Sequence, residues 1–371
     1  MSNTSGLKQP VLGAVAAIVA IALSLTICAQ FSPATLGGWV ALAVMSAIPM
    51  QIVIGLVWQS GSYPAALARL PQPAKGLAIL AVMGVAATVV APAIQAVVGG
   101  NVAPPTPFAI MYTIVSVCTA FWIVAVFQCW PMTAVSKHPA VIGAGVWVLA
   151  YVSALVLFRV TFDFSAMKDA PFYAVSLDPH GTSPAWNALS YIVTTVSVIM
   201  GFVMLDFWPT ATIARAVPAI GRQPVFGVVS ALFVLAIAAV MWEGCVVGLK
   251  MDVVDYMVRV PVSGLFGEFI MLVMMQTAPF QTTRQPVKGA ALLACAAVLA
   301  VVMYAVYAKA AILLVGPMPS GAPTYGLDLW IATAMLSITF PVFVAFGDGF
   351  AYWPLSRAAT TATAEAAAGA E

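Results

Sequence analysis

Apolar runs of about 20 residues, each long enough to cross a bilayer as a helix, fill most of this chain. Only 7% of the residues are charged and 63% are hydrophobic, so the chain lacks the polar surface that would enclose these runs in water. A segment that spans lipid must satisfy its backbone hydrogen bonds as a helix or in a closed barrel. The runs are too long, and alternate too little, to be barrel strands. The sequence therefore predicts an all-α polytopic membrane protein.

A short phrase, Gln-Pro-x-x-Gly, introduces four of these runs. It begins at Gln9, Gln72, Gln223 and Gln285, and a degenerate copy begins at His138. Each copy has a Lys or Arg nearby, and the phrase recurs at intervals that fit a pair of helices. Such recurrence indicates an internal repeat whose unit is a membrane hairpin.

A second phrase closes most of the hairpins. Four of them end with an aromatic residue followed by proline: Tyr63-Pro64, Trp130-Pro131, Trp208-Pro209 and Trp353-Pro354. The fourth hairpin ends with Ala278-Pro279 instead. An aromatic ring beside proline suits a helix end at the level of the lipid headgroups.

The two phrases divide the chain into five parallel two-helix units within one transmembrane domain, residues 11–356. The units cover residues 9–64, 72–131, 138–209, 223–279 and 285–354. The ten expected helices cover residues 11–30, 37–58, 76–98, 108–130, 140–158, 186–208, 225–247, 260–279, 289–313 and 328–353. Pro49 should kink the second helix. Residues 1–10 are expected to form an N-terminal tail, and residues 357–371 a disordered C-terminal tail.

The basic residues predict the orientation. The tails and the connections between units carry nine of them, namely Lys8, Arg69, Lys75, Lys137, Arg215, Arg222, Arg284, Lys288 and Arg357. The turns within units carry five basic residues mixed with six aspartates. The positive-inside rule places the more basic side in the cytoplasm. We therefore expect a multi-pass protein of the cytoplasmic (inner) membrane with both termini in the cytoplasm.

Glu268 is the first candidate for a functional side chain, because a carboxyl group inside a membrane is costly. It lies about nine residues into the eighth expected helix, and Gly264 and Gly267 beside it permit close approach of a helix or a ligand. One interpretation makes Glu268 a proton carrier or a cation-binding carboxylate. The other makes it a protonated residue that hydrogen-bonds to a neighbouring helix.

Further polar candidates share a position near the ends of even-numbered helices. Gln128, Asp206 and Gln276 precede the closing phrase by the same spacing, and Asp348 falls a few residues out of register. If the units surround an axis, these groups could form a polar ring at the cytoplasmic mouth, which would act as a gate or selectivity ring. The alternative is capping of helix ends near the lipid headgroups.

Several classes of function find no support in the sequence. No Walker A, GxSxG or HExxH motif occurs, and the two histidines offer no haem or di-metal ligand set. The five cysteines contain no CxxC pair, and the net charge of +2 is too small to indicate nucleic acid. We therefore expect no cofactor and no metal, and an enzyme acting on a lipid or quinone is the least favoured hypothesis.

Five side-by-side hairpins could close a ring with pseudo-fivefold symmetry around an axis. Anion channels of the tellurite-resistance/dicarboxylate class have a similar ten-helix, five-hairpin plan, which serves here as an analogy for architecture alone. An anion pore would prefer Arg or Lys, whereas the expected interior holds Glu268, Asp206 and Asp348.

Two hypotheses of function remain. The first is a transporter or channel for a small neutral or cationic solute, with proton coupling through Glu268. The second is a non-catalytic membrane subunit whose outer segments 159–185 and 248–260 dock a periplasmic or extracellular protein. Transport predicts a water-accessible path to Glu268, and a subunit predicts an apolar lateral groove. In both cases membrane lipids surround the chain.

Overall fold

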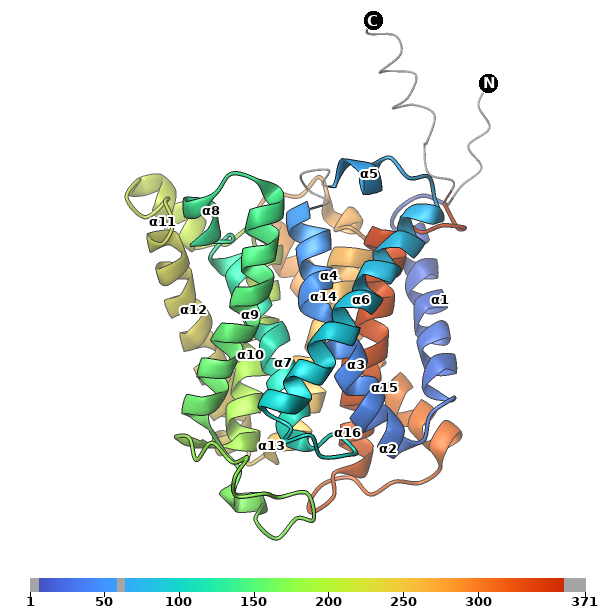
Figure 1. Cartoon of the computed structure of the whole chain (residues 1–371). Coiled ribbons are helices and arrows are strands. Elements are labelled where there is room, and N and C mark those ends of the chain that lie inside the picture. Colours follow the sequence, from blue (N-terminus) through green and yellow to red (C-terminus); the bar gives the residue numbers. More distant parts are fainter. Residues whose placement is uncertain (1–6, 59–63, 357–371) are drawn as a thin grey trace, which may run out of the picture.

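The computed structural model describes residues 7–58 and 64–356; residues 1–6, parts of the expected first connection including Gln59 and Tyr63, and the C-terminal tail lie outside the described residues. Within the described ranges, nine helices are long and apolar enough to cross a membrane. A bent pair, Pro33–Met45 and Ile48–Trp58 with an angle of 40°, makes a tenth if it is one span. The expectation of an all-α multi-pass membrane protein is confirmed (Figure 1).

The spans fall into two classes by burial, and the classes alternate along the chain. Five outer helices have between 22% and 39% of their apolar window buried, whereas the four unbroken inner spans have between 67% and 83%. The outer helices are α1 (Val11–Cys28), α6 (Ala74–Val97), α9 (Pro139–Thr161), α12 (Val225–Trp242) and α15 (Val287–Val315). Outer helices therefore face lipid, and inner spans form the core.

The inner spans are assembled from short α-helices joined by π-helical turns. The first contains α2 (Pro33–Thr35), a π turn at Leu36–Val40, α3 (Ala41–Met45), α4 (Ile48–Ile52) and a π turn at Val53–Trp58. The second contains α7 (Pro107–Phe121) and a π turn at Trp122–Val126, and the third is α10 (Ala185–Met204). The fourth contains α13 (Val253–Met257), a π turn at Val258–Val262, α14 (Ser263–Phe269) and a π turn at Ile270–Met274. The fifth contains α16 (Gly326–Thr333), a π turn at Ala334–Thr339, α17 (Phe340–Val344) and a π turn at Ala345–Gly349.

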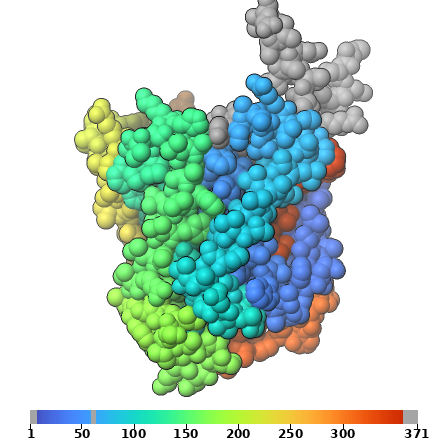
Figure 2. Space-filling view, in the orientation of Figure 1, coloured from blue at the N-terminus to red at the C-terminus, as the bar shows by residue number. Residues whose placement is uncertain are grey.

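Short elements connect the spans at the two ends of the molecule. The terminal face, where the described chain begins and ends, carries α5 (Ala65–Ala68), α8 (Met132–Val135), α11 (Thr210–Ala216) and a 3₁₀ turn at Ala278–Phe280. The opposite end, the long-loop face, carries a parallel pair of two-residue strands, β1 (Phe162–Asp163) and β2 (Ser183–Pro184), and a 3₁₀ turn at Ser165–Met167. A π turn at Glu243–Gly248 extends α12 toward this face. The loop between the strands projects from the molecule (Figures 1 and 2).

The inner spans pack against one another in sequence order, and the outer helices pack around them. Each inner span packs against the next inner span in chain order, and the fifth packs against the first. Each outer helix packs against at least two inner spans; α9, for example, contacts α7 and the π turn at Val53–Trp58, and α15 contacts α14, α10 and α16. The core is therefore a layer of five inner spans surrounded by five outer helices.

The recurring Gln-Pro-x-x-Gly phrase fastens outer helices to the ends of inner spans. In each of the four copies the Gln side-chain amide donates a hydrogen bond to a backbone carbonyl at the terminal-face end of an inner span. The bonds are Gln9 to Met274 (2.9 Å), Gln72 to Gly349 (2.8 Å), Gln223 to Val126 (3.1 Å) and Gln285 to Met204 (2.8 Å). The glycine permits this contact, because a Cβ at Gly13 would lie 2.3 Å from the Met274 carbonyl oxygen. The phrase is thus a clamp between two hairpins.

Two expected helix boundaries are corrected. The second expected helix, 37–58, is broken at Ser46 and Ala47, just before Pro49, so the expected kink is present. The eighth expected helix starts seven residues earlier than residue 260, at Val253. The reason is Asp252, which caps the helix by accepting hydrogen bonds from the backbone N–H groups of Val254 (2.8 Å) and Asp255 (3.2 Å). Most of the segment 248–260 is therefore a helix start rather than a loop.

Candidate functional site

A large cavity opens at the long-loop face where the inner spans meet. Its volume is about 730 Å³ and its walls are largely apolar. Every inner span or its adjoining turn contributes to the wall, including Gly38, Ile110, Leu189, Met257 and Leu329. Asp169 is the only Asp, Glu, Lys, Arg or His among the described residues that line it. We call this cavity the vestibule.

The vestibule ends at a plug of three phenylalanines. Phe121, Phe269 and Phe340 come from three different inner spans, and their ring centroids lie 4.8 to 6.2 Å apart. They line a residual cavity of about 40 Å³, which shares Met45 and Val193, among other wall residues, with the vestibule. All three rings are buried. Aromatic pairs at this separation attract one another, so the plug closes the centre of the bundle with apolar side chains.

Glu268 lies behind this plug rather than in it. It precedes Phe269 on α14, is 6% exposed, and accepts a hydrogen bond from the Ser197 hydroxyl on α10 (3.3 Å). The expected close approach is present, because a Cβ at Gly267 would lie 2.0 Å from the Ala296 carbonyl oxygen of α15. Neither the vestibule nor the plug cavity has Glu268 in its wall, so neither of them provides the water-accessible path to Glu268 that transport predicts. The contact with Ser197 is the one that the helix-bonding interpretation requires.

The four other candidates lie exposed at the terminal-face ends of inner spans. Gln128, Asp206 and Gln276 have the same backbone conformation, with φ of 50°, 49° and 50°, and each is followed by a second left-handed residue. In the fifth span that position belongs to Ala351 (φ 48°), and Asp348 lies three residues earlier in a π turn. Asp206 accepts a hydrogen bond from Gln285 (3.0 Å), the clamp residue of the fifth hairpin. The structure therefore gives three candidates an equivalent place and gives Asp206 a structural contact.

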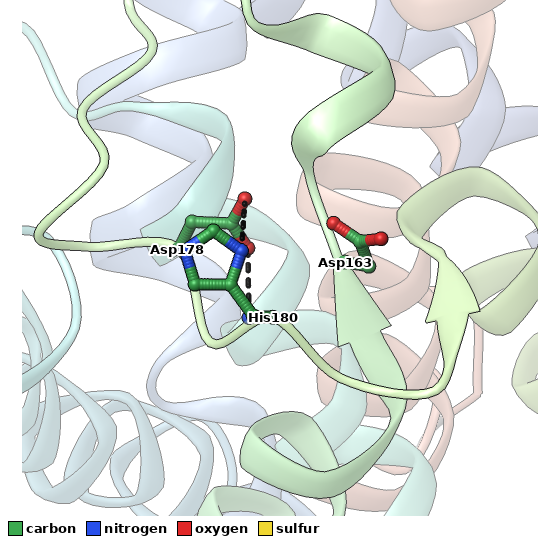
Figure 3. A group of neighbouring side chains, drawn as sticks. All are labelled: Asp163, Asp178 and His180. Atoms are coloured by element: carbon green, nitrogen blue, oxygen red, sulfur yellow. Dashed lines mark hydrogen bonds and ion pairs between the residues drawn. The ribbon is translucent and has the colours of Figure 1, made fainter.

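The long loop is fixed by a buried carboxylate. Asp178 accepts hydrogen bonds from the backbone N–H of Phe164 (3.1 Å) and from the Tyr173 hydroxyl (2.9 Å). It also accepts one from the backbone N–H of His180 (3.0 Å) (Figure 3). His180 Nδ1 also lies 3.5 Å from Asp178 Oδ2. Nearby, the Ser165 backbone N–H lowers the pKa of Asp163. Asp163, Asp178 and His180 could meet at a metal ion, but Asp178 already has three protein donors.

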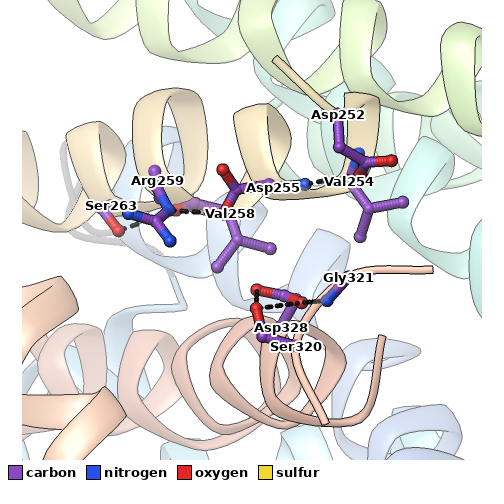
Figure 4. Close-up of polar contacts among 9 residues, drawn as sticks. All are labelled: Asp252, Val254, Asp255, Val258, Arg259, Ser263, Ser320, Gly321 and Asp328. Atoms are coloured by element: carbon purple, nitrogen blue, oxygen red, sulfur yellow. Dashed lines mark hydrogen bonds and ion pairs between the residues drawn. The ribbon is translucent and has the colours of Figure 1, made fainter. Parts of the chain in front are cut away.

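A second polar network holds the vestibule rim (Figure 4). Asp328 is fully buried and accepts hydrogen bonds from Ser320 and from the Gly321 N–H (2.9 Å). Asp255 pairs with Arg259 one helical turn later. Tyr325, a vestibule residue, donates a hydrogen bond to Asp252 (2.8 Å). Burial, and then the neighbouring Asp252, raise the pKa of Tyr325 to about 12, so the hydroxyl keeps its proton at neutral pH.

Two features were not predicted from the sequence, and only the second of them left a signal there. The plug phenylalanines are apolar residues in apolar runs, and only the fold distinguishes them from other core residues. The donor role of the repeated glutamines could have been anticipated, because a buried amide requires hydrogen-bond partners.

Comparison with known proteins adds no assignment: no family model, no curated protein and no solved structure matches this chain.

Proposed function

We propose that the five hairpins form a pseudo-fivefold ring and that its central axis is the path of a small neutral solute across the membrane. The observation that carries the proposal is the vestibule, which has wall residues from all five inner spans and ends at the Phe plug. The ring is supported by the packing of the fifth inner span against the first. The four clamps support it further, because each joins a hairpin to the inner span two hairpins earlier, counted around the ring.

The walls favour a neutral solute over a cationic one. A charge in the low-dielectric centre of a membrane protein needs a compensating group. The plug cavity has no Asp, Glu, Lys, Arg or His in its described wall, and the vestibule has only Asp169. Coupling to protons through Glu268 remains part of the proposal, because Glu268 lies directly behind Phe269 and a protonation change there would act on the plug.

The membrane and the orientation are also proposals. The distribution of basic residues favours the cytoplasmic membrane with the terminal face inside. The vestibule would then open to the periplasm or the cell exterior, and the solute would reach the plug from that side.

The test uses a variant in which the plug is permanently widened, so that the condition that opens the wild-type path need not be known. Phe269→Ala removes one of three rings, and we expect reconstituted vesicles to become permeable to small uncharged solutes, by about tenfold or more over wild type, because a hydrophobic constriction is widened. Light scattering after an osmotic step measures the permeability. Phe226→Ala on outer helix α12 is the matched control, since it removes a ring away from the axis. Permeability of Phe269→Ala no higher than that of the control would contradict the proposal.

A second candidate, a membrane subunit that docks a partner, is favoured by the long loop. Donors to Asp178 hold this loop in a defined shape that projects from the membrane-spanning part, as a docking surface would. Under this hypothesis residues 159–185 and the rim at 248–260 contact the partner, and the lateral groove that the hypothesis expects has a counterpart in a cavity between α9 and α12. Phe269→Ala would then leave vesicle permeability unchanged, so the same experiment separates the two candidates.

A further inference from the structure

A second large cavity lies on the lipid-facing side of the bundle. Its volume is about 760 Å³, and it separates outer helices α9 and α12, with α7 and α10 as its back wall. Ser153 of α9 and Leu235 of α12 line opposite sides. On α9, Val152 and Val156 are 53% and 60% exposed, as side chains facing lipid would be. We call this cavity the lateral groove.

The lateral groove and the axis are separated by one layer of side chains. Cys118 of α7 lines both the groove and the plug cavity and is 4% exposed. On α10 the sides alternate: Thr195 lines the groove, and Val196 lines the plug cavity. The seam between α7 and α10 is therefore the thin wall between lipid and axis.

One hydrogen bond between side chains crosses this seam. The Trp122 indole N–H donates to the Thr195 hydroxyl (3.0 Å), and both residues line the groove. Trp122 also begins the π turn Trp122–Val126, where the α-helical backbone pattern of α7 ends. π turns of this kind are frequent at functional sites. The bond thus lies at a break in the regular α-helical hydrogen bonding of the second inner span.

We propose that the lateral groove is a portal through which an uncharged, bilayer-soluble solute passes between lipid and the axis, and that the Trp122–Thr195 bond closes it. The inference rests on the proposed transport function, names the class of solute, and adds a lateral entrance to the axis beside the one through the vestibule. The occupant follows from the wall: Glu243 is the one Asp, Glu, Lys, Arg or His among the described lining residues, and the others are divided evenly between apolar side chains and side chains with a hydroxyl, amide or indole group. Such a wall suits an amphiphile that already partitions into the membrane, and its polar group could replace either partner of the bond.

The test follows access to Cys118 in the full-length protein in lipid vesicles. Cys28, Cys129, Cys245 and Cys295 are replaced by Ala, which leaves Cys118 as the single thiol. Alkylation by a bilayer-partitioning maleimide is compared with that by a charged, water-soluble thiosulfonate. Thr195→Val removes the acceptor, and we expect the maleimide rate to rise about three- to tenfold, the change in open population that the loss of one hydrogen bond would produce.

The adjacent residue provides a matched control. Thr194→Val removes a hydroxyl that bonds to Tyr256 (2.9 Å) in the contact between α10 and α13, away from the groove, and should leave the rate unchanged. Thr195→Ser keeps the acceptor and should restore the wild-type rate. Ser153→Cys, in a background without other cysteines, checks that the maleimide reaches the groove.

Two results would overturn the portal. One is an equal maleimide rate in Thr195→Val and Thr194→Val. The other is labelling of Cys118 by the charged reagent as fast as by the maleimide, since the route would then run through water from the vestibule. The labelling rate does not depend on transport. If Cys118 were labelled faster in Thr195→Val but Phe269→Ala gave no solute flux, the lateral opening would be supported and the transport function rejected.

Discussion

Glu268 illustrates how one residue can be correctly placed in depth and still leave its role open. Burial and close helix contact were expected from its position just after Gly264 and Gly267. Which way the carboxyl points could not be predicted, because a rotation of about 100° per residue separates Glu268 from Phe269 on the same helix. The structure directs Phe269 into the plug and Glu268 toward Ser197 in the α10 contact. The carboxyl group of Glu268 lies in the contact between α10 and α14. It can influence the axis by moving α14, which carries Phe269, relative to α10.

Replacement of Glu268 by Gln tests that influence. Gln retains the size of the side chain and an acceptor for the Ser197 hydroxyl, so the melting temperature should change little. It cannot exchange a proton, so any difference in solute flux between acidic and alkaline buffer should disappear. Flux through reconstituted protein, measured at both pH values, is the readout. A pH dependence retained in Glu268→Gln would remove this residue from the coupling mechanism.

At the scale of elements, the clamps explain why the chain repeats its phrase. Four of the five outer helices start where a Gln can reach a carbonyl at the end of an inner span, and the π turns and left-handed residues at these ends leave such carbonyls available. The glycine allows the two backbones to approach. The phrase is therefore a device for joining helices, and its conspicuous polar residues lie in helix contacts rather than along the proposed path.

A single methyl group should loosen a clamp. Gly13→Ala would place a Cβ 2.3 Å from the Met274 carbonyl oxygen, so α1 must move away from the fourth inner span. We expect a loss of about 1–3 kcal/mol of stability, the usual effect of overpacking a tight contact. Gly84→Ala on outer helix α6 has no atom within 4 Å of its new Cβ and should be neutral or slightly stabilising. Thermal unfolding in detergent, with both variants melting alike, would argue against the clamp.

The sequence predicted those elements that have a local cause. Prolines and glutamines mark the starts of outer helices, and Pro49 marks the break in the first inner span. The starts of the inner spans were harder to predict. The fourth inner span begins at Val253 because Asp252 caps it, whereas the eighth helix was expected to begin at residue 260. The vestibule and plug depend on which apolar side chains converge, and Phe121, Phe269 and Phe340 are up to 219 positions apart in the chain. No local pattern carries that information.

On the scale of the whole molecule, the two end faces differ in charge and shape. The connections with α5, α8 and α11 lie at the terminal face and carry basic residues, whereas the long-loop face holds the vestibule mouth and the aspartates of its rim. Basic loops are retained on the cytoplasmic side during insertion. The charge distribution and the proposed direction of solute entry are therefore linked, and a measurement of orientation bears on both.

Two valines allow the orientation to be measured with matched substitutions. Val175 in the long loop is 67% exposed, and Val135 at the end of α8 on the terminal face is 74% exposed. In a background without other cysteines, Val175→Cys should react with a membrane-impermeant maleimide in intact cells. Val135→Cys should react only after permeabilisation, because the positive-inside rule places it in the cytoplasm. The reverse pattern would place the vestibule mouth in the cytoplasm and turn the proposed path around, so that the solute would reach the plug from inside the cell.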